Sequence, residues 1–571
     1  MKKWLLIGIV VLAFFLRVVS LSNYSVGFTA DEASFGYDAY SLLKTGRDQW
    51  GSSWPISLRS FGDFKLPVYT YLAIPSVALF GLNEFAVRLP NALLGTLAVL
   101  FTYLMLKEFG DRLKWSKADK VALFAALLLA ISPWHIMLSR GAYEANLTSF
   151  FIPFGLWAFS RGISKPKWMV VAAFSFGINL FTYHSARLFT PLVVFGMILI
   201  EKKRLLANKS LKEAFAKYRW AIIFFMFFVL LAGFTIFFGA GARGADVAIF
   251  NPTDNWMAVS ERRYQAVLYG LPDYISRLFS NKATYVIRLF IHNLLTYLSP
   301  AFLFLQGAGE GTYGMMPGEG VLYMVEFVFI ISALISFVLK KNKMVGFFLA
   351  WIVIGFIPAS LTKGSGYAAN RAAIVMPAIQ IISAYGIYVL VEQISKRRIN
   401  FLSEKITNSI VVLVLIGSLF SFLESYIYQS PFAVAQAMNY GWRETMNYVK
   451  NVEGNYNNVI ISRSFSEPQI FPAFYLEIDP NIVQEDSKDW LRYQEEGLPF
   501  LDQLGEYNLG KYTIKNINYN DDKRLTDTLL IGRHNEFPEN IQPLKIINYP
   551  NGEPAIYIVD PVVQVYAKAN P

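Results

Sequence analysis

The sequence contains no cysteine among its 571 residues. Disulfide bonds and thiolate metal ligands are therefore excluded. Charged side chains are also scarce, since Asp, Glu, Lys and Arg make up 16% of the chain where a soluble domain carries about a quarter. That shortage excludes an ordinary soluble protein of this length and predicts that lipid, rather than water, surrounds much of the chain.

The chain is instead rich in apolar and aromatic residues, at 54% and 16%, with a mean hydropathy of +0.37. A membrane-spanning helix needs about 20 mostly apolar residues, and about eleven segments approach that length. They lie near residues 4–21, 86–106, 121–138, 146–160, 168–184, 188–200, 220–240, 321–339, 344–361, 371–391 and 406–425. The first follows Met1, Lys2 and Lys3 without a clean small-x-small cleavage site, so we expect an uncleaved membrane helix.

The basic residues follow a topological pattern. The net charge is +11, and Lys and Arg gather in the short connectors 107–120, 161–167, 202–219, 340–343 and 396–405. If Met1 is cytoplasmic, all five connectors lie on the cytoplasmic side, as the positive-inside rule requires. The distribution of charge therefore predicts how the chain is oriented in a plasma (cytoplasmic) membrane. We expect membrane lipids as partners and no binding to nucleic acid.

Three long segments then lie on the extracytoplasmic side: 22–85, 241–320 and 426–571. Irregular backbone cannot face lipid, so we expect the first two to form interfacial helices, one of them at 288–305. The third contains a predicted helix at 442–450 and short strands at 459–462, 512–517, 528–532, 544–549 and 555–559, with Asn551 and Gly552 as a hairpin turn. The predicted fold is a mainly α, polytopic transmembrane bundle (1–425) with a small extracytoplasmic α/β domain (426–571).

Ionisable residues are nearly absent from the middles of the predicted spans, where ion-coupled transporters place them. They gather in the first outer loop, which contains Asp31, Glu32, Asp63 and Lys65. A carboxylate there can act as a general base for an acceptor hydroxyl or amine, and a lysine can bind phosphate as a point charge. Taken singly, such residues are more often solvated loop charges.

Their order resembles that of a known family. An Asp-Glu pair follows the first span in FTADE (28–32), and an acidic-Lys-Pro element appears as DFKLP (63–67). Further matches are NEFAVRLPNAL (83–93), SRGAYEANL (139–147), YHSARLFTP (183–191), YLSPAFLFLQ (297–306), and Asn370-Arg371 before Pro377. This ordered set, over roughly residues 1–395, resembles the lipid-carrier-dependent GT-C glycosyltransferases, in the branch of protein O-mannosyltransferases and the aminoarabinose transferase of lipid A.

The resemblance implies roles for particular residues. Asp31 would be the catalytic carboxylate that activates the acceptor, and Glu32 would support it. Lys65 and Arg371 would bind the carrier phosphate and stabilise its growing charge. The other residues implied to bind substrate or phosphate are Asp63, Glu144, Arg88, Arg140, Tyr183, His184 and Arg187. The three arginines Arg88, Arg140 and Arg187 are equally suited to anchoring helix ends to carbonyls or headgroups.

The sequence departs from the family where relatives often show histidines, because those neighbourhoods contain Tyr313 and Tyr367 instead. The identity of any metal stays unknown. An all-oxygen set from Asp31, Asp63 and Glu144 would suit a divalent cation such as Mg or Mn, but nothing in the sequence demands one. No P-loop or strand-linked GxGxxG is present, so direct use of a nucleotide has no support.

The function predicted is therefore a membrane glycosyltransferase. It would transfer a hexosyl or pentosyl group, with inversion, from a polyprenyl-phosphate donor to an extracytoplasmic protein, lipid or glycan acceptor. One alternative is an oligosaccharide ligase that uses a pyrophosphate carrier. Others are a transporter or flippase of lipid-linked sugars, and a scaffold whose tail binds a partner.

Overall fold

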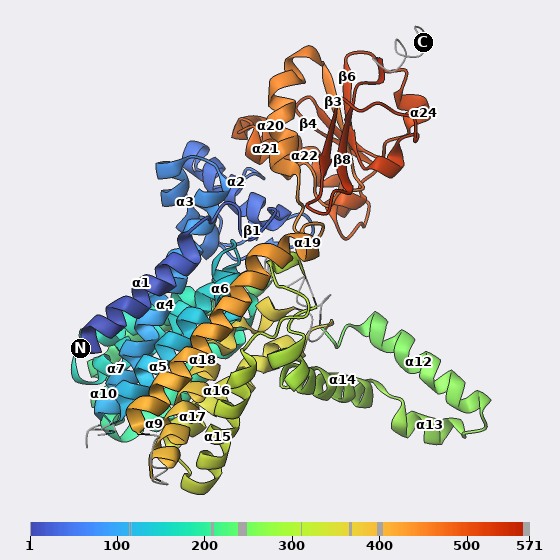
Figure 1. The fold of residues 1–571 in the computed structure, drawn as a ribbon. Coiled ribbons are helices and arrows are strands. Elements are labelled where there is room, and N and C mark those ends of the chain that lie inside the picture. The colour runs from blue at the N-terminus through green and yellow to red at the C-terminus, as the bar shows by residue number, and fades with distance from the viewer. Residues whose placement is uncertain are drawn as a thin grey trace.

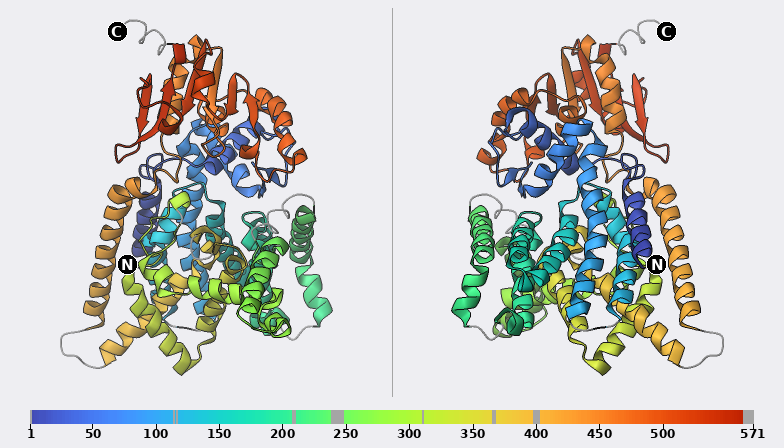
Figure 2. Two further views of the ribbon diagram at one scale, coloured as in Figure 1. Left: turned by 90° about the vertical axis from the view of Figure 1, so that its right-hand side faces the viewer. Right: turned by 90° about the vertical axis from the view of Figure 1, so that its left-hand side faces the viewer.

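The computed structural model describes residues 2–112, 115, 117–206, 210–237, 248–309, 311–364, 368–396 and 403–562. A bundle of long helices forms one end of the molecule, and a smaller α/β domain forms the other (Figure 1). In both views of Figure 2 the first loop lies between these two parts. The candidate site is built where the three regions meet.

Every predicted span falls on a helix of the bundle. These helices are α1 (Lys2–Val18), α4 (Glu84–Arg112), α5 (Ala118–Ile131), α6 (Pro133–Ser139), α7 (Thr148–Ser164), α8 (Pro166–Asn179), α9 (His184–Leu206), α10 (Leu211–Thr235), α15 (Met324–Lys340), α16 (Lys343–Ser360), α17 (Ala378–Lys396) and α18 (Glu404–Glu424). Apolar segments form helices in lipid because each backbone N–H and C=O must find its hydrogen-bond partner within its own segment.

Among the described residues, fewer helices qualify as membrane spans, by length and composition, than the eleven segments predicted. Seven helices in the described part of the chain are long and apolar enough to cross a membrane. The count rises to eight if α5 and α6, bent by 55° at Ser132, form one span. Because α1, α7 and α15 have 17 residues and α8 has 14, the total of about eleven stays a prediction.

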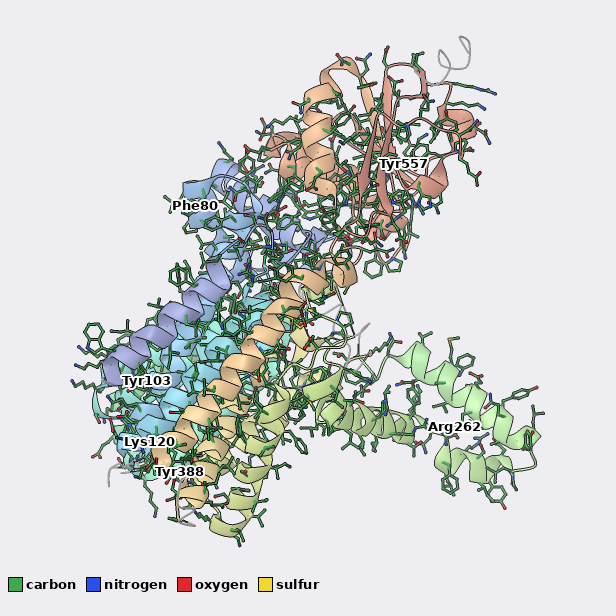
Figure 3. All side chains as sticks on the ribbon, in the orientation of Figure 1. Phe80, Tyr103, Lys120, Arg262, Tyr388 and Tyr557 are labelled. Atoms are coloured by element: carbon green, nitrogen blue, oxygen red, sulfur yellow. The ribbon has the colours of Figure 1, made fainter. Side chains whose placement is uncertain are left out.

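The basic connectors meet at one end of the bundle. Lys120 pairs with Glu404, and Arg161 pairs with Glu108 at 3.3 Å, so connectors distant in sequence touch one another. Figure 3 shows Lys120 at the end of the bundle remote from Tyr557, which lies in the α/β domain. The positive end and the α/β domain are therefore at opposite ends of the molecule.

The first outer loop folds into two helices joined by a short hairpin: α2 (Ala30–Thr45), β1 (Leu58–Arg59), β2 (Phe64–Lys65) and α3 (Val68–Phe80). Thr29 caps α2, since its side chain accepts from the Glu32 N–H while Glu32 accepts from the Thr29 N–H, a reciprocal capping box. Gly46, at φ 70°, ends the helix in a left-handed conformation that suits glycine.

The second outer segment forms an arm. Helices α12 (Pro252–Leu268), α13 (Asp273–Phe279) and α14 (Lys282–Tyr297) project sideways from the bundle, away from α1 (Figure 1). The helix expected at 288–305 begins earlier than predicted, because Asn281 caps α14. It was predicted to be interfacial, but the stretch Asp273–Leu305 is one of the seven that are long and apolar enough to cross a membrane. A separate π-helical turn, η3 (Ala301–Leu305), follows it.

The C-terminal domain is a six-stranded sheet in the order β4-β5-β3-β6-β8-β7. The strands are β3 (Asn458–Ser462), β4 (Glu506–Leu509), β5 (Tyr512–Lys515), β6 (Thr528–Gly532), β7 (Lys545–Asn548) and β8 (Pro554–Val559). The helices beside it include α20 (Trp442–Val452), α21 (Ile470–Tyr475) and α22 (Pro480–Trp490). The five predicted strands and the Asn551-Gly552 hairpin are confirmed, and β4 was missed.

Candidate active site

A cavity of about 480 Å³ lies where the first loop meets the bundle and the C-terminal domain. Asp31, near the N-terminus of α2, and Asp63, in the β1–β2 turn, form one side. Arg371, in the 3₁₀ helix η5 (Ala369–Val375), and Tyr313 also line it. Four segments distant in sequence thus bring two acidic groups and one cation to a single space.

An ion pair at the rim of this cavity joins Asp31 to Lys65. The ammonium nitrogen Nζ lies 2.7 Å from the carboxylate oxygen Oδ1. Lys65 is 8% exposed and Asp31 48% exposed, so a buried cation faces a carboxylate that is open to the cavity. Burial acts to lower the pKa of Lys65, but Asp31 and the more distant Glu467 and Glu144 outweigh it, so that the pKa is raised. Lys65 is therefore protonated at neutral pH.

Glu32 occupies a different environment from its neighbour Asp31. Its two carboxylate oxygens accept from Nε and Nη2 of Arg88 at 2.8 and 3.0 Å, and both side chains are fully buried. It also accepts from the N–H groups of Thr29 and Ala142. Since successive helix residues point in different directions, α2 presents Asp31 to the cavity and Glu32 to the protein interior.

Glu144 belongs to the same electrostatic cluster as Asp31 and Lys65. It lies in the 3₁₀ helix η1 (Glu144–Leu147), where desolvation, and then repulsion from Asp31, raise its pKa to about 7. Tyr183 lies within electrostatic reach of Glu144 and Arg371. The predicted residues Asp31, Asp63, Lys65, Glu144, Tyr183 and Arg371 are thus brought together.

All four predicted arginines contact the backbone, and Arg371 itself donates to the Lys363 carbonyl at 2.6 Å and to the Thr362 hydroxyl at 3.1 Å. Arg88 donates to the carbonyls of residues 21, 25 and 27 as well as to Glu32. Arg140 donates to the carbonyls of residues 16, 19, 20 and 24, at the end of α1. Arg187 donates to the Leu180 carbonyl and the Thr235 hydroxyl. These contacts hold the segments around the site in place. They match the alternative in which Arg88, Arg140 and Arg187 anchor helix ends to carbonyls.

The ring of His184 is hydrogen-bonded to the backbone of Phe64. Since Phe64 precedes Lys65 in β2, His184 lies close to the site. Of the two tyrosines at the family's histidine positions, Tyr313 lines the cavity and packs on Tyr143 at 5.4 Å between ring centroids. Tyr367 lies outside the described residues.

The divalent cation considered from the sequence does not fit the observed donors well. Among the residues that the structure describes, no group of three or more His, Cys, Asp or Glu side chains is placed to hold a metal ion. The Asp31 carboxylate is bound to an ammonium group, which competes with a cation for the same oxygen. Metal dependence, which the sequence left open, is not tested by these observations.

Residues that the sequence analysis missed come from the C-terminal domain. Ser466, Glu467 and Phe500 line the cavity, as does Asn439, which precedes α20. They lie in loops without hydrophobic periodicity, so no sequence signal distinguishes them from other loop residues. Only the packing of the domain on the first loop brings them to Asp31 and Asp63.

Comparison with known proteins agrees with this architecture. Residues 65–232 match the family described as dolichyl-phosphate-mannose-protein mannosyltransferase. A 121-residue region is 30% identical to the "Putative mannosyltransferase YkcB" of Bacillus subtilis (strain 168). That alignment covers 21% of this chain and only 16% of the relative's length.

The solved structure of ArnT from Cupriavidus metallidurans bound to undecaprenyl phosphate superposes over 98% of both chains, with a TM-score of 0.51 at 11% identity. Its apo form covers 98% of both chains at 9% identity, with a TM-score of 0.49. The fold is therefore that of a GT-C membrane glycosyltransferase, and the resemblance expected from the sequence is confirmed. The likeness to mannosyltransferases is confined to residues 65–232 and to the 121-residue region.

Proposed function

We propose that this protein transfers a single sugar from a polyprenyl-phosphate carrier to an acceptor on the extracytoplasmic side of the plasma membrane, with inversion of the anomeric centre. The observation that carries the proposal is the Asp31–Lys65 ion pair, at 2.7 Å, on the rim of a cavity that Arg371 also lines. A general base and two cations converging on one space suit attack by an acceptor and departure of a phosphate.

The chemical step is a single displacement. An acceptor oxygen or nitrogen forms a bond to the anomeric carbon, and the bond between that carbon and the phosphate oxygen breaks with its electron pair. Asp31, which lies 2.7 Å from the Lys65 ammonium and is open to the cavity, takes the proton of the acceptor. Lys65 and Arg371 stabilise the negative charge that grows on the leaving phosphate.

Support for a polyprenyl-phosphate donor comes from two relatives. The matched family is described by its use of dolichyl-phosphate-mannose, and the ArnT structure holds undecaprenyl phosphate. A mannosyl donor is therefore the first to test, and protein, lipid or glycan could be the acceptor.

The membrane orientation is proposed from charge. Lys120 and the connectors that meet it lie at the end of the bundle opposite the α/β domain (Figure 3). Because basic connectors remain on the cytoplasmic side, the cavity and the α/β domain face the outside. Exposed apolar residues along the bundle, such as Leu230 and Leu339, suit contact with lipid in between.

The test is release of sugar from radiolabelled polyprenyl-phosphate-mannose by purified protein in lipid, in the presence of membrane extract as acceptor. Turnover that falls at least 10³-fold in Asp31→Asn supports the proposal. Asp111→Asn is the matched control, because Asp111 is an exposed carboxylate at the opposite, basic end of α4. Full activity of Asp31→Asn overturns the assignment of the base. Movement of intact labelled lipid without cleavage indicates a transporter instead.

A further inference from the structure

The C-terminal domain is fastened directly to the first outer loop. The Leu501 N–H donates to the Phe61 carbonyl at 2.8 Å, and the Tyr37 hydroxyl donates to the Ile478 carbonyl at 2.7 Å. The rings of Trp50 and Trp490 meet edge to face at 5.6 Å. Additional contacts join Arg59 to Gln494 and Ser41 to Gln484. Together these contacts form a seam between the C-terminal domain and the first outer loop. The seam holds the domain in one position over α2, which carries Asp31, and over the β1–β2 hairpin, which carries Lys65.

The two parts approach each other closely beside Asp63. A Cβ atom on Gly62 would lie 2.3 Å from a ring carbon of Phe500 and 2.7 Å from the Pro499 carbonyl oxygen. Phe500 is 48% exposed, so one part of its ring packs on Gly62 while the rest remains open. Because Gly62 has no side chain, the Phe500 ring of the C-terminal domain can lie in the wall of the cavity, next to the Asp63 carboxylate.

Glu467 enters the same cavity from the loop after β3. Strands β5 and β6 run parallel to β3 on its two opposite sides. In open α/β sheets, ligands bind beyond the carboxyl end of a strand at which the strand order reverses in this way. Glu467 lines the cavity with Asp31 and Asp63 and acts electrostatically on Lys65.

The cavity brings together groups of both charges. Its cations, Arg371 in the lining and Lys65 behind Asp31, are assigned to the donor phosphate. The lining also contains three carboxylates, those of Asp31, Asp63 and Glu467. Ionised carboxylates only accept hydrogen bonds, so they match hydroxyl groups and repel a second anion.

We propose that the C-terminal domain forms the acceptor subsite, in which Glu467 and Phe500 bind an uncharged, hydroxyl-bearing headgroup such as a sugar ring. This inference rests on the proposed transferase function. Glu467 accepts hydrogen bonds from acceptor hydroxyls, and the exposed part of the Phe500 ring packs on the apolar face of the sugar. An acceptor with a negative charge is excluded by Glu467 and Asp63, because like charges that approach in a partly desolvated cavity repel strongly.

The experiment compares two acceptor probes that differ in one charge. Transfer from radiolabelled polyprenyl-phosphate-mannose to n-octyl glucoside and to n-octyl glucuronide is measured with the full-length protein in lipid. We expect the neutral glycoside to be preferred at least tenfold in kcat/KM. Glu467→Gln should reduce this preference several-fold, chiefly by lowering KM for the glucuronide. Glu444→Gln, an exposed carboxylate of α20 that lies outside the cavity lining, should leave the preference unchanged.

The outcomes separate this inference from the proposed function. An unchanged preference in Glu467→Gln, or equal use of both glycosides by the natural protein, overturns the assigned acceptor subsite. Release of free mannose from the donor without transfer to the glucoside overturns the acceptor class and leaves the transferase intact. If the donor itself is not cleaved under any condition, the proposed function fails, and the acceptor subsite fails with it.

Discussion

Lys65 and Asp31 form an ion pair of unequal partners, with Nζ 2.7 Å from Oδ1 but side-chain exposures of 8% and 48%. The lysine is held by its surroundings, including the Phe35 ring 4.7 Å from its nitrogen. The carboxylate remains open to the cavity. In the proposed reaction, a fixed cation beside an accessible base would give the leaving phosphate and the acceptor adjacent places, and this relationship leads to the first prediction.

Lys65→Met should lower kcat for sugar transfer by about 10²–10³-fold, because the growing charge on the leaving phosphate loses a preorganised cation. Single-turnover measurements with labelled polyprenyl-phosphate-mannose would separate this loss from weaker binding. Lys44→Met, in the exposed last turn of α2, should keep full activity. Normal kcat in Lys65→Met would contradict the role.

Arg88→Met should destabilise the fold by about 3–5 kcal/mol, because it leaves the fully buried Glu32 carboxylate without its cation. The measurement is thermal or denaturant unfolding in detergent micelles. The double variant Glu32→Gln/Arg88→Met should be more stable than Arg88→Met alone. Arg277→Met breaks an exposed pair with Asp273 and should change stability by less than about 1 kcal/mol. Equal effects of Arg88→Met and Arg277→Met would refute the structural role.

The raised pKa of Glu144 predicts that the stability of the protein depends on pH. Its pKa is raised from 4.5 to about 7 by desolvation and by Asp31, so the folded state holds a proton that the unfolded state releases. The free energy of unfolding should fall, by at most about 3 kcal/mol, as pH rises from 4.5 to 7, and then level off. Glu144→Gln should flatten this part of the melting-temperature profile. A profile that is unchanged by the substitution would argue against the raised pKa.

Gly62→Ala should impair both transfer and the docking of the C-terminal domain, because the added carbon meets Phe500 at 2.3 Å. Protease sensitivity of the domain boundary would report the displacement. Phe500→Ala in the same chain should restore part of the docking by removing the ring. Gly454→Ala, where no atom lies within 4 Å of the added carbon, is the control. Undisturbed activity and protease resistance in Gly62→Ala would contradict the tight seam.

Chelation should leave the rate of transfer within about twofold. Lys65 already supplies the positive charge at the Asp31 carboxylate that a divalent cation would otherwise provide. The assay is turnover after EDTA treatment, followed by addition of Mg²⁺ or Mn²⁺. Loss of activity with EDTA and its recovery with either metal would show that the oxygen donors of the site bind a cation after all.

Residues in ordered motifs were the most predictable part of the site. Asp31, Asp63, Lys65, Glu144 and Arg371 were expected from their order along the chain, and the structure gathers them around one cavity or one electrostatic cluster. The separation of Asp31 from Glu32 could not be predicted, because it depends on which face of α2 is covered. Arg88, on α4, pairs with Glu32 and so holds the Glu32 side chain in the protein interior.

The sequence by itself determined the class of fold, the helices of the bundle and its basic end. Lipid allows few solutions for an apolar segment, since every backbone hydrogen bond must be closed within the segment, and charge sets the orientation. Only the tertiary structure decided that Glu467 and Phe500 face Asp31 and Asp63. Loop residues acquire such positions through the packing of one domain on another, a long-range relationship that no local pattern of residues records.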